Sequence, residues 1–236
     1  MKGPPNLKHS IQQKINMRIA LDLSLNSTAM VVEHNEDHFF YNYTSKKTTR
    51  HKCMEFLNTK VFPSVKKNPN YSTDQNLKLQ RILSITNAIK EDILHFVSNS
   101  QTNVSEVVIE GYSFGSSSVS FNELVCMGSL LRAFVIEELK CKLTIVSPGA
   151  LKLATCKLVY NQKKDPITKL SGGRFKKHDM LRACKTYALK NNQFNEFDNW
   201  LKAGENYSSN YNMKSIPTPI EDIVDAFFLL ETTKQK

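Results

Sequence analysis

The sequence contains few glycines, only 8 in 236 residues, and they are scattered along the chain. Neither a G-x-G-x-x-G pattern nor a G-x-x-x-x-G-K-[ST] pattern occurs, and both phosphate-binding loops need closely spaced glycines so that the backbone can approach a phosphate. This absence argues against a dinucleotide-dependent enzyme and against a P-loop ATPase. The sequence therefore predicts a protein without a nucleotide cofactor.

Cysteine pairs and long apolar runs are also missing. The 5 cysteines form no C-x-x-C motif, and an odd number cannot pair completely. No signal peptide is apparent, so we expect a reducing compartment, the cytoplasm. No apolar run approaches the ~20 residues that span a bilayer, which argues against an integral membrane protein, and we expect no membrane partner. The abundance of Lys and Asn suggests an AT-rich genome, and for a phage or viral protein the compartment would be the host cytoplasm.

Positive charge is what the chain has in excess. Lys and Arg total 32 against 22 Asp and Glu, a net charge of +10, and the pI is about 9.3. Such a surplus favours polyanionic partners, with nucleic acid first and an anionic membrane second. The length fits one domain. We expect a basic, mobile arm over residues 1–16 and a single domain over 17–236, with insertions near 157–171 and 193–218.

Hydrophobic patterns predict a mixed α/β layer architecture. Alternation and β-branched or aromatic content predict five strands, at 17–24, 27–33, 37–44, 104–110 and 143–146. Apolar residues near a period of 3.6 predict five helices, at 74–97, 119–139, 150–159, 177–191 and 219–232. The first three strands, joined by tight turns, form an antiparallel meander. No regular structure is predicted for 44–73 beyond a helical turn at 53–57.

Four acidic residues carry the strongest chemical signal. Asp22, Glu110, Asp222 and Asp225 stand in apolar sequence, where an unpaired buried charge costs several kcal/mol. Each alone is also explained by an ion pair with Lys or Arg, and Asp222 by its place at a helix N-terminus. Together they form a set of hard oxygen ligands that suits Mg²⁺ or Mn²⁺. In a basic protein this set indicates two-metal phosphodiester hydrolysis.

The order and spacing of these acids resemble the RuvC-type Holliday junction resolvases of the ribonuclease H-like superfamily, in particular the phage-encoded members. The resemblance rests on Asp22-Leu-Ser-Leu-Asn-Ser-Thr, on Ile-Glu110-Gly-Tyr-Ser-Phe-Gly-Ser-Ser and on Asp222-Ile-Val-Asp225-Ala. It implies a ribonuclease H-like fold, with three antiparallel strands and then two parallel strands in a five-stranded mixed sheet flanked by helices. It also implies that the four acids bind two Mg²⁺ ions, for which Mn²⁺ can substitute, and that a dimer cuts four-way junctions leaving 5′-phosphates.

The resemblance extends to basic and aromatic residues, each of which has an ordinary structural explanation as well. Lys152 and Lys176 or Lys177 fall where the family keeps cations near the scissile phosphate, with Arg174 beside them on the DNA. Tyr112 and Phe114 follow Glu110 where family members place an aromatic that stacks on a junction base. The lysines are equally explained as solvated side chains, and Phe114 as packing under its loop.

Other functions stay open at this point. One alternative is a related nuclease acting on flaps or other branched DNA, and another is a DNA-binding derivative that no longer cleaves. An actin-like or sugar-kinase-like phosphotransferase also opens with an Asp on a first hairpin, but it needs a glycine-rich hairpin and a longer chain. The insertions have no counterpart in the family, and Ala29 replaces the glycine that commonly follows the first turn.

The helix expected at 119–139 is apolar over a wide arc, which predicts burial on two sides. One apolar row is Leu124, Met127, Leu131 and Phe134, and a second is Val125, Gly128, Arg132 and Val135. Gly128 and Ser129 would allow a partner helix to approach closely. We therefore expect a homodimer through this helix, with coverage by residues 193–218 as the alternative.

Overall fold

The computed structural model describes residues 16–35, 37–45, 58–112, 119–161, 177–191 and 218–234. The expected basic arm and most of the two expected insertions lie outside these ranges.

A six-stranded mixed sheet forms the centre of the fold, in the order β4-β3-β2-β1-β5-β6. Its strands are β1 (Met17–Asp22), β2 (Ser27–His34), β3 (Asp37–Thr44), β4 (Asn58–Val61), β5 (Val104–Glu110) and β6 (Lys142–Val146). Strands β1, β2 and β3 pair antiparallel, while β5 pairs parallel with β1 and β6 parallel with β5. Without β4, this order and these directions are those of the ribonuclease H-like fold, which confirms the expected class.

Strand β4 was not expected from the sequence. It pairs parallel with β3 and extends the sheet by one edge strand. Its sequence, Asn-Thr-Lys-Val, lacks the alternation of apolar and polar residues that marks a half-buried strand. Three of its four residues are exposed. Its conformation depends on the free edge that β3 offers, which a local pattern does not reveal.

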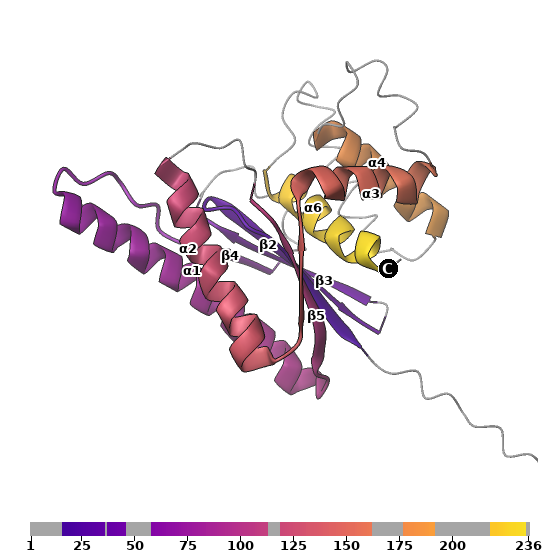
Figure 1. The fold of residues 1–236 in the computed structure, drawn as a ribbon, viewed down its shortest axis with the longest axis horizontal. Helices are drawn as coiled ribbons and strands as arrows, with labels where there is room; N and C mark the ends of the chain where they lie inside the picture. The colour runs from indigo at the N-terminus through magenta and orange to yellow at the C-terminus, as the bar shows by residue number, and fades with distance from the viewer. Residues whose placement is uncertain are drawn as a thin grey trace, which may run out of the picture.

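Helices cover both faces of the sheet (Figure 1). They are α1 (Tyr71–Ser100), α2 (Val119–Phe134), α3 (Pro148–Tyr160), α4 (Lys177–Asn191) and α6 (Thr218–Thr233), and a π-helical turn η2 (Val135–Leu139) continues α2. Helices α1 and α2 lie on one face, and α3, α4 and α6 lie on the other (Figure 1). None of the helices in the described ranges is long and apolar enough to cross a membrane.

The alternation of side chains along β1 and β5 divides the core into two halves. Ile19 and Leu21 are buried against α1 and α2, whereas Ala20 and Val108 are buried against α3, α4 and α6. Because successive strand residues point to opposite faces, the residue two beyond Ala20 also faces α6. That residue is Asp22, so the period of the strand directs this carboxylate toward the last helix.

Candidate active site

Asp22 and Glu110 are the last residues of two adjacent strands. Parallel pairing sets Ala20 beside Val108 and Leu21 beside Ile109, so Asp22 and Glu110 end up side by side at one edge of the sheet. Asp22 is buried with 7% of its surface exposed, and Glu110 is half-buried. Parallel strands that end together place their terminal side chains at a common edge.

The turn after Asp22 is held by local hydrogen bonds. The Thr28 hydroxyl donates to the Ser24 carbonyl at 2.7 Å, and the Ser24 backbone N–H donates to Thr28 Oγ1 at 3.2 Å. Across the turn, Asp22 is paired with Ala29 of β2. These bonds close the hairpin immediately beyond the carboxylate and restrict where its backbone can lie.

Helix α6 brings the other two acids to the same edge. Asp222 is buried and Asp225 is half-buried, and both stand in the first half of the helix, three positions apart on one side. The rest of the helix is among the most buried parts of the chain, with Phe227, Phe228 and Leu229 fully enclosed. Burial of this apolar surface fixes α6 on the sheet, and with it the two carboxylates.

The electrostatics of Asp22 show that the four acids converge. Burial raises the pKa of Asp22 well above its usual range, and the negative charges of Glu110, Asp222 and Asp225 raise it further. A side-chain hydrogen bond with Glu110 acts in the same direction. The charges of three acids, one from a second strand and two from a helix, therefore all act on Asp22.

Such a group of acids fits a divalent cation. Like charges that are buried together disfavour their ionised forms, and a cation among them removes this penalty. Carboxylate oxygens are the ligands that Mg²⁺ and Mn²⁺ prefer. The donor set is therefore compatible with the ions that the sequence predicts.

The structure places one of the expected basic residues near this edge and leaves the others undescribed. Lys152 is half-buried on α3, which begins directly after β6, and it forms no ion pair with any described residue. Lys177 opens α4, but its side chain is not described. Arg174, Lys176 and Phe114 lie outside the described residues.

Tyr112 packs against α2 of its own chain. Its hydroxyl donates to the Val125 carbonyl at 3.3 Å, and the Arg132 guanidinium lies 4.7 Å from its ring centre. A Cβ added at Gly128 would lie 2.0 Å from the Tyr112 hydroxyl. Gly128 therefore makes room for Tyr112 of the same chain. The expectation that Gly128 makes room for a partner helix is wrong. Tyr112, one of the two aromatic residues expected to stack on a junction base, therefore packs against α2 of its own chain.

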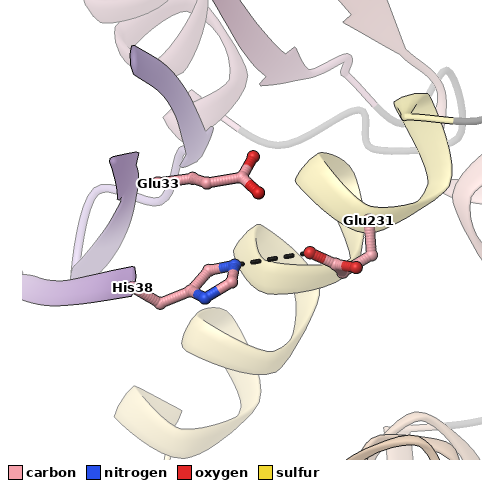
Figure 2. Close-up of side chains that lie close together, drawn as sticks. All are labelled: Glu33, His38 and Glu231. Atoms are coloured by element: carbon pink, nitrogen blue, oxygen red, sulfur yellow. Dashed lines mark hydrogen bonds and ion pairs between the residues drawn. The ribbon is translucent and has the colours of Figure 1, made fainter. Parts of the chain in front are cut away.

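A second cluster of metal-ligand side-chain types lies at the opposite end of β1 and β2. Glu33, His38 and Glu231 offer ligand atoms that lie within 4.8 Å of one another (Figure 2). His38 Nε2 is 3.3 Å from a Glu231 oxygen, and Lys234 pairs with Glu231 at 2.7 Å and also with Glu33. The lysine ammonium already supplies a cation between the two carboxylates, so this cluster ties α6 to the sheet.

Arg18 extends the same network to β5. Its guanidinium donates to Glu106 at 2.8 and 3.1 Å and to Glu33 at 3.3 Å. It also donates to the Leu230 carbonyl and the Thr233 hydroxyl at the end of α6. The sequence-based predictions did not include these residues, although the sequence contains a pattern that indicates them. Arg18 and Glu106 stand in apolar strands, as Asp22 does, and an opposite charge in a neighbouring strand predicts an ion pair.

Comparison with known proteins gives structural likeness only. No protein-family model matches the chain, and no curated protein matches it. RuvC of Thermus thermophilus in complex with a Holliday junction substrate is 7% identical, with a TM-score of 0.45 over 93% of this chain and 95% of that chain. A second Thermus thermophilus RuvC structure is 8% identical with a TM-score of 0.44, over 93% of this chain and 95% of that chain. A Ppx/GppA family member from Aquifex aeolicus is 9% identical, with a TM-score of 0.31 over 61% of this chain and 40% of that chain.

Proposed function

We propose that this protein is a magnesium-dependent endodeoxyribonuclease that cuts four-way DNA junctions during recombination, replication or repair. The observation that carries the proposal is the convergence of Asp22, Glu110, Asp222 and Asp225 at one edge of a ribonuclease H-like sheet. The net charge of +10 supports a nucleic acid as the substrate.

The four acids would hold two Mg²⁺ ions in this proposal. When bound, such ions activate a water and stabilise the charge on the attacking and leaving oxygens of an in-line displacement. Asp22 and Glu110 contribute rigid ligands because each ends a buried strand, and Asp222 and Asp225 contribute ligands from a helix that packs on the same strands. Lys152 lies on the helix that follows β6 and would pair with a phosphate of the bound strand.

The test is a cleavage assay with purified protein on four synthetic substrates: a four-way junction, a flap, a bubble and a linear duplex. We expect paired cuts in the junction that require Mg²⁺ and leave 5′-phosphates, with little cutting of the duplex. Preferential cutting of the flap would assign the protein to another branch-cutting activity. Tight junction binding without cutting in Mg²⁺ or Mn²⁺ would instead support a non-catalytic DNA-binding derivative.

A homodimer is part of the proposal, because symmetrical cutting of a junction needs two active sites related by a two-fold axis. Helix α2 and its extension η2 present an outward stripe at Ser129, Ala133 and Ile136, whose spacing places them on one side of the helix. Ile136 is 59% exposed, although it is large and apolar. Met127, Leu131 and Phe134 point the other way and are buried.

We expect sedimentation at micromolar concentration to give twice the 26.9 kDa of one chain. Introducing a charge into the stripe with Ala133→Glu should give a monomer, because an unpaired charge is costly in a buried interface. Ile145→Glu is the matched control, since Ile145 is also exposed and apolar but lies on β6. A wild-type monomer, with and without junction DNA, would contradict the dimer.

A further inference from the structure

A pocket of about 400 Å³ lies beside the turn that follows Asp22. It is bounded by the turn itself, by the segment before α1, by α1 and by α2. The charged residues of its lining are the cations Lys67, Lys78 and Arg81 and the acids Asp74 and Glu123, which give the lining a net charge of +1.

The two acids of the pocket are engaged by one lysine. Lys78 Nζ lies 3.0 Å from an Asp74 oxygen and 3.4 Å from a Glu123 oxygen. Asp74 additionally accepts the backbone N–H of Asn68 at 2.9 Å, and these contacts with Asn68 and Lys78 lower its pKa. The negative charges are therefore balanced within the protein, mostly by Lys78, which leaves Lys67 and Arg81 as the cations available to a ligand.

Arg81 joins the pocket to the turn. Its Nη2 donates to the Leu25 carbonyl, to Asn26 Oδ1 at 3.2 Å and to Ser45 Oγ at 3.3 Å. Its Nε is buried and has no hydrogen-bond partner among the described residues. Leaving a buried donor without an acceptor is unfavourable, and none of the described residues supplies an acceptor for this Nε. Guanidinium N–H groups match the oxygens of a phosphate, and Nε of Arg81 is such a group without a partner among the described residues.

The distance from Asp22 suits a neighbouring phosphate of a bound strand. Leu25 is three residues beyond Asp22, and three residues span at most about 10 Å. A DNA strand advances about 3.4 Å along its axis per nucleotide, so an axial advance of up to about 10 Å corresponds to two or three nucleotides. The acids face α6 and the pocket lies on the α1 side, so the strand would pass over the tip of the turn between them.

We infer that this pocket binds a backbone phosphate of the DNA strand that is cut, two or three nucleotides from the scissile bond, through Lys67 and Arg81. The inference rests on the proposed function, because it assumes that a DNA strand passes the four acids. The role of the pocket is to set the register of the strand at the active site. Helix α1 and the segment before it thereby take part in substrate binding, which the sequence did not indicate.

The test measures binding without cleavage, in EDTA, on a four-way junction that carries a single uncharged methylphosphonate. The substituted position is moved through the five phosphates on each side of the mapped cut. In the wild-type protein, one position two or three nucleotides from the cut should weaken binding more than its neighbours. In Lys67→Gln the same substitution should have a smaller effect than in the wild type, because one of the two partners of that phosphate is already removed.

Salt dependence gives a second readout. Lys67→Gln should reduce the slope of log K against log salt by about 1, the value for one lost phosphate contact. Arg81→Lys keeps the charge but loses the planar fork, so it should leave the slope nearly unchanged while reducing the effect of the same methylphosphonate.

Lys140→Gln is the matched control for Lys67→Gln. Lys140 is exposed and stands before β6, at the end of the sheet opposite Glu110, and it should behave as the wild type does. Equal salt slopes and equal methylphosphonate profiles for Lys67→Gln and Lys140→Gln would overturn the pocket while leaving the nuclease proposal intact. A wild-type protein that does not bind junctions would overturn both.

Discussion

Asp22→Asn is expected to lower Mg²⁺-dependent junction cleavage by several orders of magnitude while leaving junction binding largely intact. The substitution keeps the size of the side chain and removes one ligand charge from the centre of the acid cluster. Binding persists because cationic side chains contacting phosphates supply most of the affinity. The measurements are single-turnover cleavage and binding of the same labelled junction. Wild-type cleavage rates in Asp22→Asn would contradict the assignment of the active site.

Thermal unfolding gives a readout of the same site that does not depend on activity. Asp22→Asn should be more stable than the wild type at neutral pH without metal, because burial and the three neighbouring acids disfavour an ionised carboxylate at this position in the folded chain. Mg²⁺ at one hundred times its dissociation constant should stabilise the wild type by about 2.7 kcal/mol for each ion bound, and the variant by much less. Asp37→Asn is a suitable control, since Asp37 is exposed on β3 and far from this edge of the sheet. It should change neither cleavage nor the response to Mg²⁺.

Local sequence was sufficient for most of the fold. The range 37–44 coincides with β3 because aromatic residues favour strands, and 104–110 coincides with β5 because a short apolar run rich in Val and Ile favours a buried strand. The range 177–191 coincides with α4, whose apolar residues recur near a period of 3.6. The four acids were indicated by the apolar residues that stand close to each of them in the sequence. Their convergence additionally required the order of the strands, which the likeness to a known family supplied.

The parts that were missed depend on contacts between residues far apart in the chain. Arg18 is 88 residues from Glu106 and 212 from Leu230, so no window of sequence contains the pair. Arg81 lies in the middle of α1, where its spacing is that of an ordinary solvated helix position, yet it reaches the turn at Leu25. Gly128 looked like a contact point for a second helix, and only the position of Tyr112 reveals its use.

The network around Arg18 matters because it anchors the helix that carries two of the four acids. Arg18 donates to the last turn of α6, and Lys234 and Tyr187 donate hydrogen bonds to Glu231 on the same turn.

Burial raises the pKa of Glu231, but hydrogen bonds with His38, Lys234 and Tyr187 outweigh burial and lower it to about 2. Burial likewise raises the pKa of Glu106, and bonds from Thr144, Lys142 and Arg18 lower it to about 2.

These lowered pKa values predict a loss of stability in acid. A carboxyl group with a lower pKa in the folded state than in the unfolded state, where Glu titrates at about 4.3, stabilises the fold fully above that value. The contribution disappears as the pH falls from about 5 towards 2, because the unfolded chain then takes up protons that the folded chain does not bind. The free energy of unfolding should therefore decline over this interval, and Glu231→Gln should show a smaller decline than the wild type.

Arg18→Met is expected to lower the free energy of unfolding at pH 7 by about 3–5 kcal/mol, the cost of removing one partner from a buried ion pair. Methionine keeps much of the length of the side chain, so the loss is mainly that of the bonds to Glu106, Glu33 and α6. Lys142→Met is the matched control, because Lys142 pairs with the same Glu106 at 2.9 Å but is 69% exposed. An exposed pair contributes about 1 kcal/mol or less, so this control should unfold nearly as the wild type does in urea. Equal losses in the two variants would mean that Arg18 acts as one more surface charge and does little to hold α6 on the sheet.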